Sequence, residues 1–232
     1  MNEVSNTCYM CDAPATSGEH VPPKCLFPER KDLPPQTDLR KNLFKKVPSC
    51  DSHNSQKSQD DEYFLYVLST SFQINEIGRN LYRTKVRRAI KRNASVLGKI
   101  ASTATPVTYS VPNSDDIIIS VAHKLDEDRF NTMIDRLARA IYFYHSKEKW
   151  TYGIRYQAEF LFATINQSDK ANARIKEISR QADEWFSDVP YIGENREVFK
   201  YQALEADNSR IMRLHFYEGC KLLLIFNSQQ QL

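Results

Sequence analysis

The sequence of 232 residues contains no long hydrophobic run and carries little net charge. No window approaches eighteen apolar residues, so we expect no transmembrane helix and no membrane partner. The first residues, MNEVSNTCYM, lack the basic and apolar regions of a secretory signal peptide, which predicts a cytoplasmic protein. The net charge is only +3, so the chain as a whole is not a strongly basic nucleic-acid binder. What matters for such binding is therefore where the positive charge lies along the chain.

Cysteine is scarce, odd in number and unevenly spaced, which in a reducing compartment favours metal ligation over a disulfide framework. Cys8 and Cys11 form a C-x2-C pair, and Cys50 and His53 form a C-x2-H pair. Four ligands of these types suit a tetrahedral structural zinc ion. The alternative is that these residues are small unligated side chains, because free cysteine is often simply buried.

The remaining cysteines and histidines predict ordinary packing roles. Cys25 and Cys220 have no partner at ligand spacing, so we expect buried thiols. His123, His145 and His215 lie among apolar or aromatic residues, which favours core or surface positions over metal ligation.

Proline is concentrated in the N-terminal quarter of the chain. Seven of the ten prolines fall between Pro14 and Pro48, which excludes long regular helices or strands there. A segment with so small a core is typical of a metal-stapled module. Within it we expect short extended pieces at 17–21 and 43–47, followed by a helix that begins near residue 51.

A basic stretch follows this module. Between Arg79 and Lys99 there are eight Lys or Arg residues and no acidic residue, on a rough helical pattern. The pattern predicts a helix with one buried and one basic face. That basic face is either an ordinary solvated surface or a track for nucleic-acid phosphates. Its candidate phosphate-binding residues are Arg79, Arg83, Arg87, Arg88, Lys91 and Arg92. Lys85 lies within the same basic run.

Turn-forming residues at 102–116 suggest a boundary between an N-terminal domain, 1–101, and a C-terminal domain, 102–232, that binds a partner or regulates. After the boundary the sequence predicts a strand at 116–122, with Asp126 as the N-cap of the next helix. The further elements expected are a helix at 126–145, a helix that begins at 168 and ends before Pro190, and three strands within 198–226. The expected fold is α+β, with a C-terminal helix and antiparallel-strand region.

The stretch GEHVPPK and the Asn that follows His53 need a separate explanation, because a zinc ion closed by four protein ligands does no chemistry. Glu19 and Asn54 offer hard oxygen donors that suit a second cation, Mg2+ or Mn2+. His20 beside it would be free to act as a general base. The alternatives are a loop histidine for His20, an orienting charge for Glu19 and a helix cap for Asn54.

The segments CYMC, GEHVPPK, KNLFKKVPSC and CDSHN together resemble the HNH, or ββα-metal, endonuclease family over residues 8–66. The resemblance implies a short hairpin and a helix around one catalytic divalent ion, braced by zinc. It implies that Glu19 ligates the ion, that His20 activates water, and that Asn54 is the closing ligand. It also implies that Asn42 shapes the loop and orients the histidine. The sequence departs from the family in having Glu where Asp is commoner and His53 as the fourth zinc ligand.

The function implied is hydrolysis of phosphodiester bonds, with DNA as the expected substrate. Members of similar appearance belong to anti-phage defence and mobile elements and often act with a protein partner. The alternative is a zinc-containing nucleic-acid-binding or adaptor module that has lost catalysis. The acidic run Asp60–Asp61–Glu62 is expected to be a solvated turn at the start of a helix, outside the site. The alternative is that Asp61, seven residues after Asn54, shares a helix face with it and binds metal or positions water.

Overall fold

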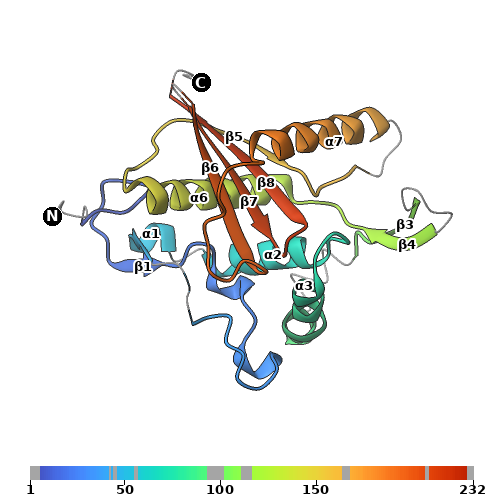
Figure 1. The fold of residues 1–232 in the computed structure, drawn as a ribbon. Helices are drawn as coiled ribbons and strands as arrows, with labels where there is room; N and C mark the ends of the chain where they lie inside the picture. Colours follow the sequence, from blue (N-terminus) through green and yellow to red (C-terminus); the bar gives the residue numbers. More distant parts are fainter. Residues whose placement is uncertain are drawn as a thin grey trace.

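The structure is a computed structural model that describes residues 6–41, 43, 46–54, 57–92, 102–110, 117–163, 168–206 and 209–228. It contains both helices and sheets, which confirms the α+β class (Figure 1). Its α-helices are α1 (Asp51–Asn54), α2 (Lys57–Ser69), α3 (Glu76–Leu81), α4 (Arg87–Arg92), α6 (Glu127–Ser146) and α7 (Ser168–Trp185). Its strands are β1 (Ser17–Glu19), β2 (Val47–Ser49), β3 (Thr105–Ser110), β4 (Ile117–Ala122), β5 (Ile154–Ala158), β6 (Phe199–Ala206), β7 (Ser209–Phe216) and β8 (Cys220–Asn227).

The N-terminal part has the order strand, strand, helix that the sequence predicts. Strand β1 pairs antiparallel with β2, with Ser17 opposite Ser49 and Glu19 opposite Val47. The second strand begins at Val47, later than expected, and α1 follows it after one residue. The proline-rich connection between the strands contains only short 3-10 turns among its described residues, at Lys24–Leu26 and Arg30–Asp32.

The C-terminal part is built on a four-stranded antiparallel sheet with the order β5-β8-β7-β6. Alternate residues of β8 point to opposite faces, as the strand period of two requires. Leu222, Leu224 and Phe226 join the main hydrophobic core with α2 and α6, whereas Leu223 joins a smaller cluster with Ala182 of α7. The sheet is therefore covered by α6 and α2 on one face and by α7 on the other (Figure 1).

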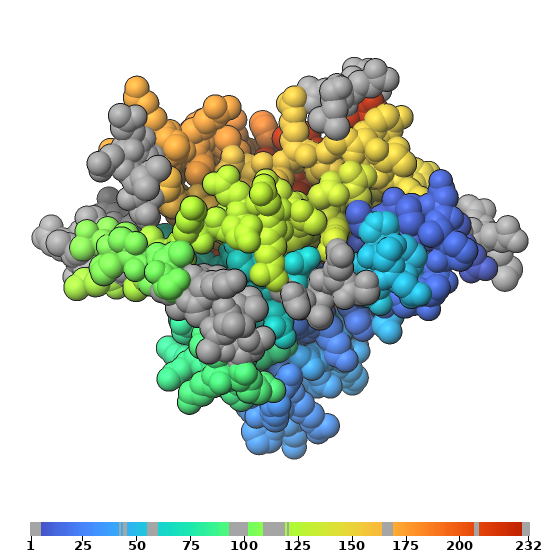
Figure 2. Space-filling view, turned by 180° about the vertical axis from the view of Figure 1, so that it is seen from behind, coloured from blue at the N-terminus to red at the C-terminus, as the bar shows by residue number. Residues whose placement is uncertain are grey.

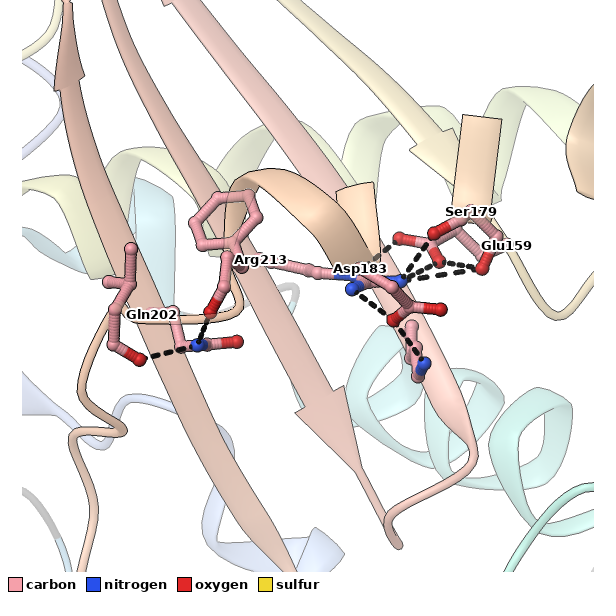
Figure 3. Close-up of polar contacts among 8 residues, drawn as sticks. Glu159, Ser179, Asp183, Gln202 and Arg213 are labelled. Atoms are coloured by element: carbon pink, nitrogen blue, oxygen red, sulfur yellow. Dashed lines mark hydrogen bonds and ion pairs between the residues drawn. The ribbon is translucent and has the colours of Figure 1, made fainter. Parts of the chain in front are cut away.

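A polar network fastens α7 to its face of the sheet (Figure 3). Arg213 of β7 is almost fully buried, and its guanidinium donates to both carboxylate oxygens of Glu159, at 2.9 and 2.6 Å. A further nitrogen of Arg213 donates to Asp183 of α7 at 2.6 Å, and the Ser179 hydroxyl donates to Glu159 at 2.5 Å. A buried charge needs such pairing, because an isolated one would lose its hydration without compensation.

One hydrophobic core joins the two halves of the chain. The ring of Phe64 in α2 packs edge-on against Phe130 of α6 and Phe216 of β7. The hydroxyl of Tyr217, next to β7, donates to the carbonyl of Leu26 at 2.6 Å. The expected boundary between residues 101 and 102 therefore does not separate two hydrophobic cores.

Two described strands were missed by the sequence analysis. Strand β3 pairs with β4 over six residues each, in a hairpin that extends away from the four-stranded sheet (Figure 1). Strand β3 lies within residues 102–116, where the turn-forming residues predict a domain boundary rather than a strand. Strand β5 lies at an edge of the large sheet and alternates little in hydrophobicity. No described helix is both long and apolar enough to cross a membrane.

Candidate metal centre and the adjacent cavity

The four predicted zinc ligands lie together. The ligand atoms of Cys8, Cys11, Cys50 and His53 are all within 4.8 Å of one another. The Nδ1 atom of His53 is 3.4, 3.6 and 3.2 Å from the sulfurs of Cys8, Cys11 and Cys50, and the sulfurs of Cys11 and Cys50 are 3.8 Å apart. Tetrahedral zinc, with bonds of ~2.3 Å to sulfur and ~2.0 Å to nitrogen, requires about 3.5 Å for a sulfur–nitrogen edge and about 3.8 Å for a sulfur–sulfur edge. The group could therefore hold a metal ion such as zinc.

Backbone hydrogen bonds hold the two ligand pairs in register. The N–H of Tyr9, within the first pair, donates to the carbonyl of Pro48 in β2 at 2.8 Å. The N–H of Thr16 donates to the carbonyl of Ser49 at 3.0 Å. Because Cys50 comes directly after β2, pairing of β1 with β2 brings it to the loop that carries Cys8 and Cys11.

The local chemistry favours a thiolate at Cys50. The Ser52 hydroxyl lies 3.0 Å from the Cys50 sulfur. This hydrogen bond, with further help from the backbone and ring of His53, lowers the pKa of Cys50 to about 6. Since metals bind the thiolate rather than the thiol, the environment suits a metal ligand.

The C-terminal part of the chain also contacts this centre. The ammonium group of Lys149, shortly after α6, donates to the carbonyl of Cys11 at 2.7 Å and to Asp12 at 3.0 Å. From behind, the yellow-green surface of α6 lies beside the blue and cyan surface of the N-terminal segment (Figure 2). The metal centre is thus held against the C-terminal half as well as within its own hairpin.

Glu19 and His20 lie at the end of β1 and line a small cavity of about 20 Å³. Glu19 is 5 % exposed, and His20 is half-buried. Asp60 and Asp61 of α2 line the same cavity, as does Arg136 of α6, together with apolar side chains of α6. This volume holds about one water molecule or a bare ion. The cavity brings together side chains from both halves of the chain.

Asn54 is placed differently from its predicted partners. Its side chain is exposed at the end of α1 and donates to the Ser17 hydroxyl of β1 at 2.9 Å, and it does not line the cavity. Among the described His, Cys, Asp and Glu residues, only the Cys8 cluster gathers three or more ligand atoms at metal-binding distances. The second cation site at Glu19 and Asn54 therefore stays a prediction. Asn42 lies outside the described residues.

Asp60 and Asp61 line the cavity, although the sequence predicts that they lie outside the site. The expectation of a solvated turn was wrong for Asp60, whose side chain is 19 % exposed. It accepts from Arg129 at 2.9 Å and from Arg136 at 3.0 Å. The partners are 69 and 76 residues away in sequence, so no local pattern could have revealed them.

Tyr9 is fully buried, and its phenol lies close enough to Glu19 for the two side chains to interact. Burial, and then the neighbouring Glu19 carboxylate, raises the pKa of Tyr9 well above its usual range. Arg136 acts in the opposite direction on the same phenol. Glu19 and Arg136, from two other segments of the chain, thus act in opposite directions on the pKa of Tyr9.

The basic stretch is divided into α3, a π-helical turn at Tyr82–Val86, and α4, rather than one helix. Three of its predicted phosphate-binding residues are in ion pairs. Arg79 and Arg83 pair with Glu76 at 3.7 and 2.6 Å, and Arg88 pairs with Asp32 at 2.6 Å. The exposed residues of the track for which the structure describes no ion pair are Arg87, Lys91 and Arg92. Lys85 is half-buried and donates to the carbonyl of Cys25 at 2.8 Å.

Comparison of this chain with protein-family models, with curated proteins and with solved structures finds no match.

Proposed function

We propose that this protein is a metal-dependent endonuclease of the HNH type that hydrolyses phosphodiester bonds, with DNA as substrate. One observation carries the proposal: the adjacent residues Glu19 and His20, at the end of a strand paired with β2, line a cavity next to α2, and the same strand pair leads into a Cys3His group that could hold a metal ion. The order of strand, strand and helix is the one that the family resemblance requires.

The chemistry follows from the roles available to these side chains. His20 would accept a proton from a water molecule as that water attacks the phosphorus in line with the leaving oxygen. The new bond joins the water oxygen to phosphorus, the phosphorus–oxygen ester bond breaks, and the leaving oxygen takes a proton from solvent. A divalent cation, Mg2+ or Mn2+, bound beside Glu19 would stabilise the added negative charge of the transition state. Zinc in the Cys3His centre would hold the hairpin and the helix together.

The oxygen donors around the cavity suit such a cation chemically. Glu19, Asp60 and Asp61 line the cavity and offer carboxylates, the ligand type that Mg2+ and Mn2+ prefer. Both oxygens of Asp60 are paired with arginines and the three carboxylates are not gathered at metal-binding distances, so binding of a cation would require them to move. Asn54 would have to leave its hydrogen bond with Ser17 to join them. The family resemblance also implies a role in anti-phage defence or in a mobile element, with a protein partner that controls activity. We include both in the proposal.

The direct test is cleavage of supercoiled plasmid with Mg2+ or Mn2+, with EDTA as the metal-free control. We expect His20→Ala to keep its zinc content and melting temperature but to lose on the order of 10² to 10⁴ in rate, as removal of a general base does. His123→Ala is the matched control, because His123 lies away from this cavity and bonds Tyr66. Cleavage by His20→Ala at the wild-type rate would overturn the proposal.

The second candidate is a non-catalytic zinc-containing module that binds nucleic acid or acts as an adaptor. It is favoured by the small size of the cavity, by its cover of α6 side chains, and by the exposed position of Asn54. Plasmid that remains intact with wild-type protein at every metal tested, while the protein still binds DNA, would support it.

A further inference from the structure

Arg136 is the positively charged residue that lines the cavity with Glu19 and His20. It comes from the middle of α6, in the half of the chain beyond the predicted nuclease motif. Its side chain is 17 % exposed, so its guanidinium is largely withdrawn from water. Electrostatic interactions are stronger in such surroundings than at an exposed surface.

Asp60, the ion-pair partner of Arg136, is also paired with a second arginine. One nitrogen of Arg136 donates to Asp60 Oδ2 at 3.0 Å, while Arg129 donates to the other oxygen, Oδ1, at 2.9 Å. Arg129 also lies over the ring of Tyr63, at 4.7 Å, and does not line the cavity. Arg136 could therefore turn from Asp60 to another anion without leaving the carboxylate unpaired, which would otherwise be costly.

We propose that Arg136 is a catalytic residue that binds the scissile phosphate, so that α6 of the C-terminal half completes the nuclease site. The proposal rests on the proposed function, because the phosphate is the one attacked beside His20. A guanidinium presents several N–H donors in a plane and matches two phosphate oxygens at once, which an ammonium group does not. Such a contact stabilises the charge that accumulates on those oxygens in the transition state.

The size of the cavity defines how substrate must arrive. A space of about 20 Å³ does not admit a phosphodiester group, so binding of the phosphate by Arg136 would require this side chain to turn from Asp60 and the lining of the cavity to open. A bound phosphate would compete with the Asp60 carboxylate for the same guanidinium. Arg129 keeps Asp60 in place during that exchange.

The test compares Arg136→Gln and Arg136→Lys with Arg139→Gln, a control that removes another largely buried arginine of α6, one that pairs with Asp135 and does not line the cavity. We expect kcat to fall by about 10² to 10³ in Arg136→Gln, as on removal of one preorganised donor, and by at least about 10-fold in Arg136→Lys. Arg139→Gln should stay within about threefold. Zinc content and melting temperature are measured for every variant. Equal losses in Arg136→Gln and Arg139→Gln would show a structural role and overturn the proposal.

A binding measurement separates this inference from the nuclease proposal. In a His20→Ala background without added Mg2+ or Mn2+, so that zinc in the Cys3His centre is kept, the affinity for a labelled DNA duplex is measured with and without Arg136→Gln. We expect the Arg136→Gln change to weaken binding and to reduce its salt dependence, because a phosphate contact is lost. If wild-type protein cleaves nothing but this loss of affinity remains, the nuclease proposal fails and the phosphate contact stands. If affinity is unchanged, the phosphate contact is overturned whatever the cleavage assay gives.

Discussion

His215 is a buried histidine in a positively charged part of the sheet. It lies on β7 opposite Lys200 of β6 and Lys221 of β8, two residues after Arg213, with the ring of Tyr191 at 5.3 Å. Burial, followed by the charges of Arg213, Lys221 and Lys200, lowers the pKa of His215 to about 3. The imidazole therefore stays neutral in the folded state at any pH above that value.

This depressed pKa predicts a dependence of stability on pH. Above about pH 6.5 the ring is neutral in both folded and unfolded chains and contributes nothing. As pH falls from 6.5 toward 3, only the unfolded chain takes up the proton, so the free energy of unfolding decreases. Between pH 7.5 and 5 the wild type should lose about 2 kcal/mol more than His215→Gln, measured by urea unfolding. Parallel losses in the two proteins would contradict the assignment.

Residue-level prediction succeeded where the chemistry was local in sequence. The C-x2-C and C-x2-H spacings identified Cys8, Cys11, Cys50 and His53, because each pair sits on a single turn. The role of Asp60 was invisible for the opposite reason, since its partners lie on a helix that folds back from far along the chain. The hydrogen bond from Asn54 to Ser17 likewise joins residues that are 37 positions apart, so no local pattern could reveal it.

At the scale of elements, the hairpin of β1 and β2 is too short to be stable alone. It has three residues in each strand, whereas an isolated two-stranded hairpin is marginal even when longer. A metal in the Cys3His centre would supply the missing stabilisation, because metal binding free energy becomes folding free energy.

Removal of the metal tests this dependence. We expect Cys50→Ser to lose one zinc ion per chain by elemental analysis and to lower the melting temperature, with protease cleavage first appearing between residues 6 and 54. Cys25→Ser is the matched control, because Cys25 is outside the metal cluster. Equal zinc content in both variants, or a melting temperature unaffected in Cys50→Ser, would contradict a structural metal.

Among the other elements, prediction followed the strength of the hydrophobic pattern. Strands β6 to β8 and helices α6 and α7 were expected because long amphipathic or apolar runs end at clear turn residues, and Asp126 caps α6 by accepting from Arg129 N–H at 3.2 Å. Strand β3 was missed because Pro106 and several hydroxyl residues are also typical of linkers. Proline is tolerated there because each strand of a two-stranded hairpin has a free edge.

At the scale of the whole molecule, whether the chain forms one or two domains depends on which distant segments pack together. Composition changes near residue 102 and gave a boundary, but composition does not show which apolar faces meet. In the structure α2 packs against α6, and the main core takes side chains from residues 8 to 226. A core shared in this way makes each half depend on the other for burial of its apolar surface.

Truncation at the predicted boundary tests that dependence. We expect fragments 1–101 and 102–232, expressed separately, to lack cooperative thermal unfolding, because the first would expose Phe64 and the second Phe130 and Phe216. Circular dichroism and the dispersion of amide proton resonances report this directly, with the full chain as control. Mixing or co-expression of the fragments should restore a cooperative transition, since the interface between them is the core itself. A fragment that unfolds cooperatively on its own would establish an independent domain and contradict this dependence.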